Sequence, residues 1–182
     1  MAYRNQQHFI ETLEKAGELL RIKTYVDPDL EMAEITDRMS KQPGGGKALL
    51  FENTGYDFPV FMNAYGSEKR MCMALGVENL NDVAKEIESL FKLLSAPKEG
   101  ILDKLKLLPK LGRFASWMPT VKNGRGECQE MVMTEKPIPS GGVWGGPPDI
   151  TKLPVITCWP NDGGPFVTLP VIHTKDPNTG IR

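Results

Sequence analysis

Amphipathic helical segments alternate with short apolar strand segments through the first 95 residues of the chain. The helical segments carry apolar side chains three and four positions apart, whereas the strand segments are brief runs of aliphatic and aromatic residues. We predict strands over residues 19–22, 48–51 and 59–63, and helices over residues 5–16, 28–42, 68–75 and 80–94. Helices and strands that alternate in this way predict an α/β unit.

Several residues are suited to the ends of these helices. Asp27 can cap the second helix, and Pro28 suits its first helical position, where the missing N–H group would have no partner. Ser67 and Asn79 are expected to cap the third and fourth helices, and Gly76 is expected to stop the third. The fourth helix has the clearest apolar stripe, so we expect it to face a core or an interface.

Three consecutive glycines at residues 44–46 invite comparison with a phosphate-binding loop. Such a loop needs Lys and then Ser or Thr after its last glycine, and a helix must follow. Here Lys47 is followed by Ala48 and an apolar run that predicts a strand. We therefore interpret the glycines as a flexible connection between a helix and a strand.

The composition changes after residue 95. Residues 101–108 form a short, basic, amphipathic stretch together with the flanking Lys98 and Lys110. The sequence leaves open whether its apolar face packs on the same protein or lies on a membrane surface. Residues 128–134 alternate weakly, as a strand would, and the Pro- and Gly-rich residues 137–154 are typical of an extended crossover. We expect a domain boundary in this region, between an α/β domain and the start of a β-rich domain, over residues 1–115 and 116–182.

A turn, a strand and a second turn are predicted at the end of the chain. Asn, Asp and two Gly at residues 161–164 tolerate turn conformations, residues 166–174 are apolar and β-branched, and residues 176–180 have Pro near the start and Gly at the end. A second turn predicts a returning strand, yet only two residues follow it. We therefore expect a chain that is cut inside or just after a hairpin.

Charge and cysteine usage exclude some classes of function. The net charge of −1 argues against nucleic acid as the main partner, because that binding depends on Lys and Arg that neutralise phosphates. No apolar run approaches the roughly 20 residues that span a bilayer, and the polar first seven residues do not resemble a signal peptide. The three cysteines are widely spaced, which predicts reduced thiols in a cytoplasmic protein. A metal cluster is not expected, since only His8 and His173 could join them.

Seven short sequence blocks, spread in order over nearly the whole chain, form a specific pattern. They are residues 17–22, 26–31, 48–53, 55–60, 153–164, 168–170 and 174–177. The longest reads LPVITCWPNDGG, at residues 153–164. One block alone is weak, but the ordered set is specific. Together the blocks resemble the UbiD family of decarboxylases, which comprises 3-octaprenyl-4-hydroxybenzoate carboxy-lyase and its relatives.

The resemblance implies an α+β fold class, in which an α/β N-terminal unit is followed by the beginning of a split β-barrel that binds flavin. Residues 166–174 would form an early strand of that barrel. The implied reaction is the reversible, non-oxidative decarboxylation of aromatic or α,β-unsaturated carboxylic acids, with 3-octaprenyl-4-hydroxybenzoate in ubiquinone-type biosynthesis as the best-known substrate. The implied cofactor of the full-length parent is prenylated flavin mononucleotide (FMN), with a divalent metal, Mn or Mg, and a monovalent cation near its phosphate, and stable binding by residues 1–182 alone is not expected. A flavin prenyltransferase as cofactor supplier, a homo-oligomer and a cytoplasmic location also follow from the resemblance.

The same resemblance assigns little chemistry to residues of this chain. The family's metal ligands and its acid–base network of one Arg and two Glu belong to a motif that would begin just after Arg182, so we assign no catalytic and no metal-binding residue. Thr168 aligns with a family position that touches the flavin and is our one cofactor-binding residue; a strand Thr that only satisfies its neighbours is the alternative. Trp159 either covers a ring face or only packs. His173 is expected to be an ordinary strand residue, and Asp162 to close a turn.

Two other functions remain open from the sequence. The first is a non-catalytic domain that contacts other subunits through the amphipathic helix over residues 80–94. The second is a different split-barrel flavin reductase that uses ordinary FMN, although no nicotinamide site is evident. Glu52 and Asn53 follow a predicted strand, a common place for functional groups, but we expect them to serve as cap and turn residues.

Overall fold

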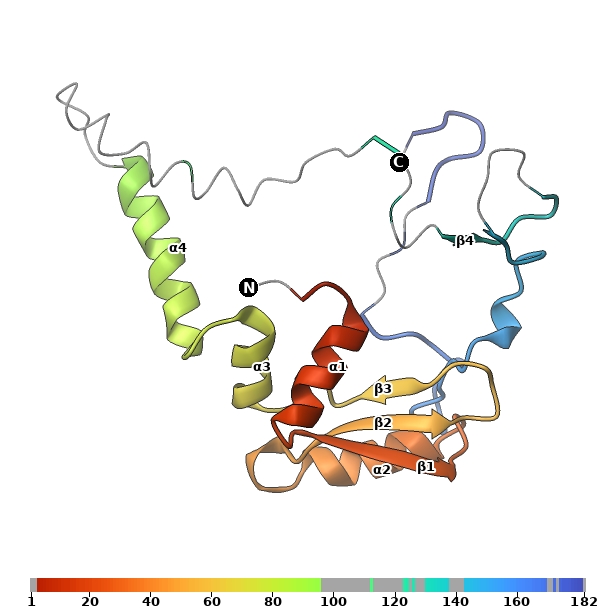
Figure 1. The fold of residues 1–182 in the computed structure, drawn as a ribbon, viewed down its shortest axis with the longest axis horizontal. Coiled ribbons are helices and arrows are strands. Elements are labelled where there is room, and N and C mark those ends of the chain that lie inside the picture. Colours follow the sequence, from red (N-terminus) through yellow and green to blue (C-terminus); the bar gives the residue numbers. More distant parts are fainter. Residues whose placement is uncertain are drawn as a thin grey trace. The chain divides into compact units, whose positions relative to one another are not determined.

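The computed structural model describes residues 3–95, 112, 123–124, 126, 130–137, 143–169, 172 and 174–181. The chain divides into two compact units, one formed by Met1–Asp82 with Thr151–Arg182 and the other by Val83–Ile150 (Figure 1). The domain boundary expected at residue 115 and the basic stretch over residues 101–108 lie outside the described residues. Both therefore stay predictions.

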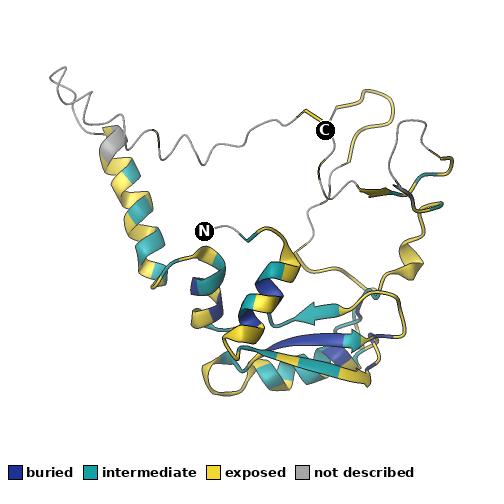
Figure 2. Ribbon diagram, viewed as in Figure 1, coloured by how far each residue is buried: buried dark blue, intermediate teal, exposed yellow. Residues whose placement is uncertain are grey.

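A three-stranded sheet organises the first unit. Its strands are β1 (Leu19–Tyr25), β2 (Ala48–Asn53) and β3 (Val60–Met62), in the order β1-β2-β3. β2 pairs in parallel with β1 and antiparallel with β3. The first four residues of β2 are buried, as expected for a central strand that is covered on both faces. Figure 2 shows this strand as the darkest part of the sheet, and the predicted alternation of helices and strands is confirmed.

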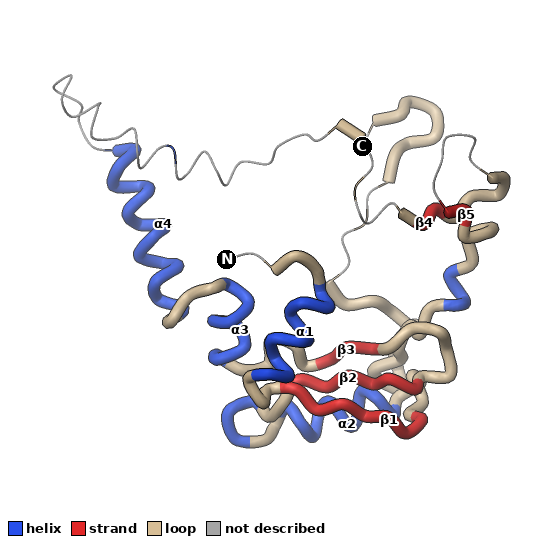
Figure 3. The backbone as a smooth tube through the Cα atoms, viewed as in Figure 1, coloured by secondary structure: helices blue, strands red, loops and turns tan. Residues whose placement is uncertain are grey.

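Helices cover both faces of this sheet (Figure 3). On one face, α2 (Glu31–Ser40) packs its Met32 with Leu49 and Phe51 of β2. On the other face, α1 (Gln6–Lys15) packs Phe9 and Leu13 against Ala48, and α3 (Glu68–Leu75) adds partly buried side chains to the same cluster. Because β1 and β2 are parallel, α2 is the crossover of a β-α-β unit.

The C-terminal part of the chain returns to this unit over residues 153–166, which we call the return segment. Ile156 is 8% exposed and belongs to the core cluster of Met32, Leu49 and Phe51. The N–H group of Thr157 donates to the Pro28 carbonyl at 3.2 Å. One apolar side chain and this backbone pairing therefore fasten the return segment to the segment that precedes α2.

Most predicted helix ends are confirmed. The Ser67 hydroxyl accepts the Arg70 N–H group at 3.1 Å, and Gly76 ends α3 in the left-handed conformation with φ +68°. α4 (Leu80–Ser95) begins after Asn79, whose side chain accepts the Asn81 N–H group at 2.8 Å. These caps depend only on neighbouring residues, which explains why sequence reasoning finds them.

The prediction for the start of α2 is wrong. The helix begins at Glu31, three residues after Pro28, and Leu30 precedes it with φ +67°. The Asp27 side chain instead accepts the Asp29 N–H group at 2.9 Å in a local turn. The Leu30 N–H group donates to the Thr157 carbonyl at 3.0 Å. Pairing with the distant return segment therefore holds these residues out of the helix.

The strand predicted over residues 166–174 is also wrong for the described residues. Phe166 forms a single antiparallel bridge with Ile156, and residues 167–169, 172 and 174 are not in a strand. Pro165 and Pro170 have no N–H group to donate, and Leu169 has φ +57°, outside the β region. Apolar, β-branched composition cannot form a strand where the backbone donors and dihedral angles do not allow pairing.

The second unit contains most of α4 and a two-stranded parallel pair, β4 (Met131–Val132) with β5 (Val143–Trp144). The predicted strand near residues 128–134 is therefore confirmed only over its middle, and the region expected to be an extended crossover contains β5. The apolar stripe of α4 is open, since Ile87 is 49% exposed and Phe91 is 64% exposed. The core-facing role expected for this helix is not seen among the described residues.

If the return segment is part of the core, Ile156→Ala should lower the free energy of unfolding by about 2–4 kcal/mol, because it leaves a cavity beside Phe51. The control is Ile150→Ala, since Ile150 is 79% exposed and should change stability by less than about 0.5 kcal/mol. Urea unfolding followed by circular dichroism measures both. Equal stability of the two variants would contradict the packing of this segment.

Candidate functional site

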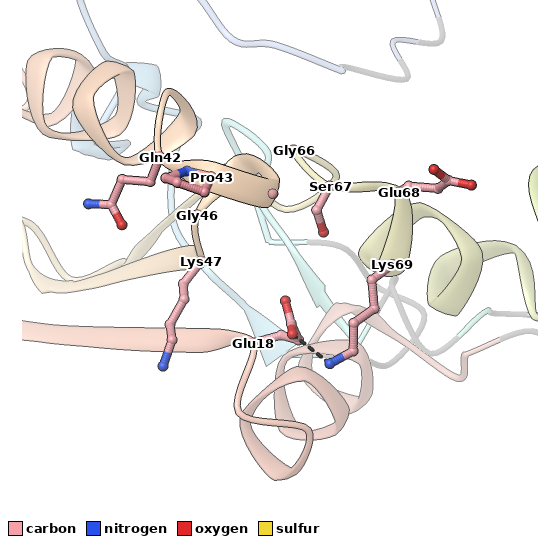
Figure 4. Close-up of a pocket in the computed structure, with 10 residues that line it drawn as sticks. Glu18, Gln42, Pro43, Gly46, Lys47, Gly66, Ser67, Glu68 and Lys69 are labelled. Atoms are coloured by element: carbon pink, nitrogen blue, oxygen red, sulfur yellow. Dashed lines mark hydrogen bonds and ion pairs between the residues drawn. The ribbon is translucent and has the colours of Figure 1, made fainter.

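Gly44 and Gly46 of the triple glycine line an open hollow of about 710 Å³ (Figure 4). The turn η1 (Pro43–Gly45) and the start of α3 border it from two sides. Its walls are made by Glu18, Gln42, Pro43, Gly44, Gly46, Lys47, Gly66, Ser67, Glu68 and Lys69. We call it the glycine-turn hollow.

The side chain of Arg70 ties the glycine turn to α3. Arg70 is fully buried, and its Nη1 and Nη2 groups donate to the carbonyls of Gly46 at 2.5 Å and Gly45 at 3.1 Å. Nη1 also donates to the Glu18 carboxylate at 3.2 Å. The Nε atom is buried without a hydrogen-bond partner in the described structure. A buried guanidinium needs such acceptors, because losing its hydration is costly.

The glycines are required by close backbone contact. A Cβ atom on Gly45 would lie 1.8 Å from the Gly66 carbonyl oxygen, and one on Gly46 would lie 2.1 Å from the Met39 carbonyl oxygen. Both glycines also have positive φ, at +81° and +56°. The strand β2 begins directly afterwards at Ala48. The interpretation as a helix-to-strand connection is confirmed, although the turn is tightly packed.

The charges around Glu18 compensate one another. Its carboxylate accepts from Lys69 Nζ at 2.6 Å, in addition to Arg70, and the Glu18 side chain is 18% exposed. The hydrogen bond from Lys69, followed by that from Arg70, lowers the pKa of Glu18 below its ordinary value, against the opposing effect of burial. Glu18 is therefore held as a carboxylate in an ion-pair network and is a poor proton acceptor.

The residues named for flavin contact lie elsewhere, near the return segment. Thr168 is exposed in a bend, with no hydrogen bond from its hydroxyl to another described residue. Trp159 is 59% exposed and lines a small hollow of about 210 Å³ against α2. The backbone N–H group of Trp159 donates to Asp162 Oδ2 at 3.0 Å, so the turn-closing role of Asp162 is confirmed. His173 and Arg182 lie outside the described residues.

Neither described cysteine has the properties of a nucleophile. Cys72 and Cys158 are free thiols, and Cys72 is buried. Burial, and then the nearby Asp162 carboxylate, raise the pKa of Cys158, which disfavours its thiolate. Within the described parts of the chain, no three His, Cys, Asp or Glu side chains come together in a way that could hold a metal ion.

Glu52 is an ion-pair partner, which corrects the cap-and-turn role expected for it. Its carboxylate accepts from Arg21 Nη1 at 2.5 Å, and Arg21 also binds Glu14 at 2.6 Å. Asn53 ends β2, and its carbonyl accepts the Val26 N–H group at 3.2 Å.

Sequence reasoning missed the burial of Arg70, because one Arg in a helix gives no pattern that distinguishes a buried guanidinium from a solvated one.

Removing the Arg70 guanidinium should strongly destabilise the fold. We expect Arg70→Met to lower the free energy of unfolding by about 3 kcal/mol or more, because two turn carbonyls and Glu18 lose a buried donor. Arg38→Met is the matched control, since Arg38 is 78% exposed in a pair with Glu34 and should matter by less than about 0.5 kcal/mol. Chemical denaturation compares the two variants. Similar losses of unfolding free energy would contradict the role of Arg70 in holding the glycine turn to α3.

The lowered pKa of Glu18 predicts a pH dependence of stability. A carboxyl whose pKa is lower in the folded state stabilises the fold above its unfolded pKa, near 4.5. That contribution disappears as the pH falls through the lower, folded value. Glu18→Gln should therefore be less stable than the wild type at pH 7 and lose less stability between pH 5 and pH 3. Parallel stability curves for the two proteins over that range would refute this assignment.

Two curated relatives match almost the entire chain. A protein of uncharacterized function from Aquifex aeolicus is 46% identical over 181 residues, and one from Archaeoglobus fulgidus is 44% identical over 181 residues. Each match covers 99% of this chain and 34% of the relative. The chain therefore spans about a third of the length of the curated relatives that it matches.

Solved structures of two enzymes are also similar. Vanillic acid decarboxylase of Sedimentibacter hydroxybenzoicus in its open form is 27% identical, with a TM-score of 0.43, over 48% of this chain and 19% of that chain. The UbiD-class enzyme HmfF from Pelotomaculum thermopropionicum in complex with FMN is 26% identical, with a TM-score of 0.38, over 51% of this chain and 19% of that chain. An evolved dimeric form of HmfF in complex with prenylated FMN is 30% identical, with a TM-score of 0.37, over 51% of this chain and 20% of that chain.

Two family models match the chain in succession. The N-terminal domain of 3-octaprenyl-4-hydroxybenzoate carboxy-lyase matches residues 10–90, and the Rift-related domain of the same enzyme family matches residues 120–182. Together the two matches cover well over half of the chain. The first includes the three-stranded sheet, α2, α3 and the second half of α1, and the second includes the return segment. The chain therefore belongs to the UbiD family of carboxy-lyases.

Proposed function

We propose that residues 1–182 act as the N-terminal part of a UbiD-type decarboxylase that depends on prenylated FMN. The observation that carries the proposal is the succession of two domain models of that family in one chain, over residues 10–90 and 120–182. The proposed substrates are aromatic or α,β-unsaturated carboxylic acids, with 3-octaprenyl-4-hydroxybenzoate as one candidate. Loss of carbon dioxide leaves negative charge on carbon, and the bound flavin supplies the electron sink for that charge.

The proposed contribution of this chain to the cofactor site is one wall. Gly163 and Gly164 have no atoms within 4 Å of the position of a Cβ atom, and Thr168 is exposed four residues further on. This open surface fits the approach of a planar ring, and the Thr168 hydroxyl can donate a hydrogen bond to a carbonyl or phosphate oxygen. The proposed task of these residues is to bind and orient the cofactor.

Proton transfer and metal binding are proposed to lie outside residues 1–182. The family resemblance assigns the metal ligands and the Arg and Glu acid–base residues to a later motif. We accordingly propose a divalent metal, Mn or Mg, and a monovalent cation for the complete site, and no turnover by this chain alone. Assembly as a homo-oligomer, cytoplasmic location and cofactor supply by a flavin prenyltransferase belong to the same proposal. In the described residues, no helix is long and apolar enough to cross a membrane.

The proposed cofactor contact predicts the effect of a single substitution. Thr168→Val should weaken retention of prenylated FMN by about 2- to 10-fold, because one hydroxyl hydrogen bond is lost. Thr24→Val is the control, since Thr24 is an exposed residue of β1. Titration of each chain with prenylated FMN, followed by flavin absorbance, measures how strongly the cofactor is retained. The assay is completed with Mn²⁺, K⁺ and 4-hydroxybenzoate, and we expect no carbon dioxide above the blank.

Each part of the proposal has its own contradicting outcome. Equal flavin retention by wild type and Thr168→Val would remove the role of Thr168. Carbon dioxide release by the chain alone would contradict the proposal that the acid–base and metal-binding residues lie outside residues 1–182. A chain that never takes up flavin but self-associates in sedimentation would favour the interaction domain, for which the exposed Ile87 and Phe91 of α4 offer an apolar face.

A further inference from the structure

A second hollow lies where the parallel strands β1 and β2 end. It has a volume of about 460 Å³ and is lined by Tyr25, Asp27, Pro28, Asp29, Thr54, Gly55, Tyr56, Val155, Thr157 and Pro165. We call it the tyrosine hollow. Its walls come from the carboxyl ends of two parallel strands and from the return segment. The carboxyl end of a parallel sheet is a frequent place for ligands.

Two tyrosine rings stand at this hollow with much of their surface open. Tyr25 is 56% exposed, and Tyr56 is 45% exposed. The Tyr25 ring lies over Gly55, since a Cβ atom there would be 3.2 Å from Tyr25 Cε2. The fully buried Thr54 holds the loop, because its hydroxyl donates to the Phe58 carbonyl at 2.8 Å and accepts the Tyr56 N–H group at 3.3 Å. Both rings are therefore carried on backbone that is fixed by packing.

Two carboxylates, of Asp27 and Asp29, lie at the hollow beside the rings. Asp27 Oδ1 accepts the Asp29 N–H group at 2.9 Å, and the backbone of Asp29 is bridged to Thr157 of the return segment. Both Asp residues are exposed, and no ion pair between described residues involves either of them. Glu31 adds a third negative charge nearby, since its carboxylate accepts the Asp27 N–H group at 2.8 Å. The hollow is therefore negative and partly aromatic.

We propose that the tyrosine hollow binds an organic cation through an ammonium or guanidinium group. Aromatic faces attract such groups through cation–π interaction, and the carboxylates supply complementary charge. The volume suits a small amine or one basic side chain, rather than a bare metal ion, which would need several converging ligands. The same chemistry is offered by a free diamine and by an Arg or Lys side chain of a peptide, and the experiment distinguishes these two sources.

The test is a titration of the ¹⁵N-labelled chain with agmatine, which carries both a guanidinium and an ammonium group. We expect saturable shifts of the amide signals of Tyr25, Gly55, Tyr56 and Thr157, with a dissociation constant of about 1 mM in low salt. Pentanamide, a neutral molecule of similar length, should leave these signals unchanged. Raising the NaCl concentration to about 0.5 M should weaken binding severalfold, because exposed charges are screened.

Variants separate recognition from folding. Asp27→Asn keeps an oxygen for the Asp29 N–H group but removes one charge, and we expect about two- to fivefold weaker binding of agmatine. Tyr56→Leu removes an aromatic face and should weaken binding by a similar factor. Asp57→Asn is the matched control, because Asp57 is an exposed acid of the same loop that does not line the hollow. Unchanged signals elsewhere in each spectrum establish that the variant is folded.

A second arm uses the peptide acetyl-Gly-Arg-Gly-amide in place of agmatine. Shifts at the same amides for either probe support the proposal, and the tighter probe identifies the source of the cation. The proposal is overturned if neither probe gives saturable shifts up to 20 mM. It is equally overturned if pentanamide shifts the same signals as strongly as agmatine, or if Asp57→Asn weakens binding as much as Asp27→Asn.

Discussion

The buried guanidinium of Arg70 connects α3 to the segments that lead into β1 and β2. Because the guanidinium is fully buried, its donors depend on oxygens of the protein, and Nη1 and Nη2 find them in the glycine turn and in Glu18. Glu18 immediately precedes β1, and only Lys47 separates the last glycine of the turn from β2. One side chain from α3 therefore holds the entry points of two neighbouring parallel strands. The Ala48 N–H group donates to the Glu18 carbonyl at 2.9 Å, which continues the same connection into the sheet.

The two ends of the sheet consequently have different characters. At the amino ends of β1 and β2, charges are paired, and the pKa of Glu18 is lowered by its partners. The backbone of the glycine turn packs there so closely against Met39 and Gly66 that no side chain fits on Gly45 or Gly46. At the carboxyl ends, the aromatic rings and carboxylates of the tyrosine hollow are exposed. The amino ends are therefore charge-compensated and closely packed, whereas the carboxyl ends are open, and in α/β sheets ligands bind outside the carboxyl ends of the strands.

The return segment joins the two family domains at one place in the structure. Residues matched by the Rift-related model contribute Ile156 to the core of the sheet that the N-terminal model covers. Among the described residues that follow, Leu169 and Ile172 are apolar side chains with 79% and 75% exposure, and the proposed flavin contact Thr168 lies beside them. An apolar stretch of this kind gains stability only when other strands or a ligand cover it, which agrees with the proposed role as one wall of a larger site.

The sequence by itself determined the elements whose causes are local. The helical stripes, the Ser67 and Asn79 caps, the stop at Gly76 and the turn closed by Asp162 each depend on residues within a few positions. The ordered sequence blocks likewise pointed to the family. Tertiary structure alone decided the late start of α2, the burial of Arg70, the pairing of Glu52 with Arg21 and the irregular backbone of the described residues that follow Phe166. Each of these depends on a hydrogen bond or ion pair between residues far apart in the chain, or on backbone angles that composition does not encode. Local periodicity cannot specify such partners, because which donors and acceptors meet is decided only when the chain packs.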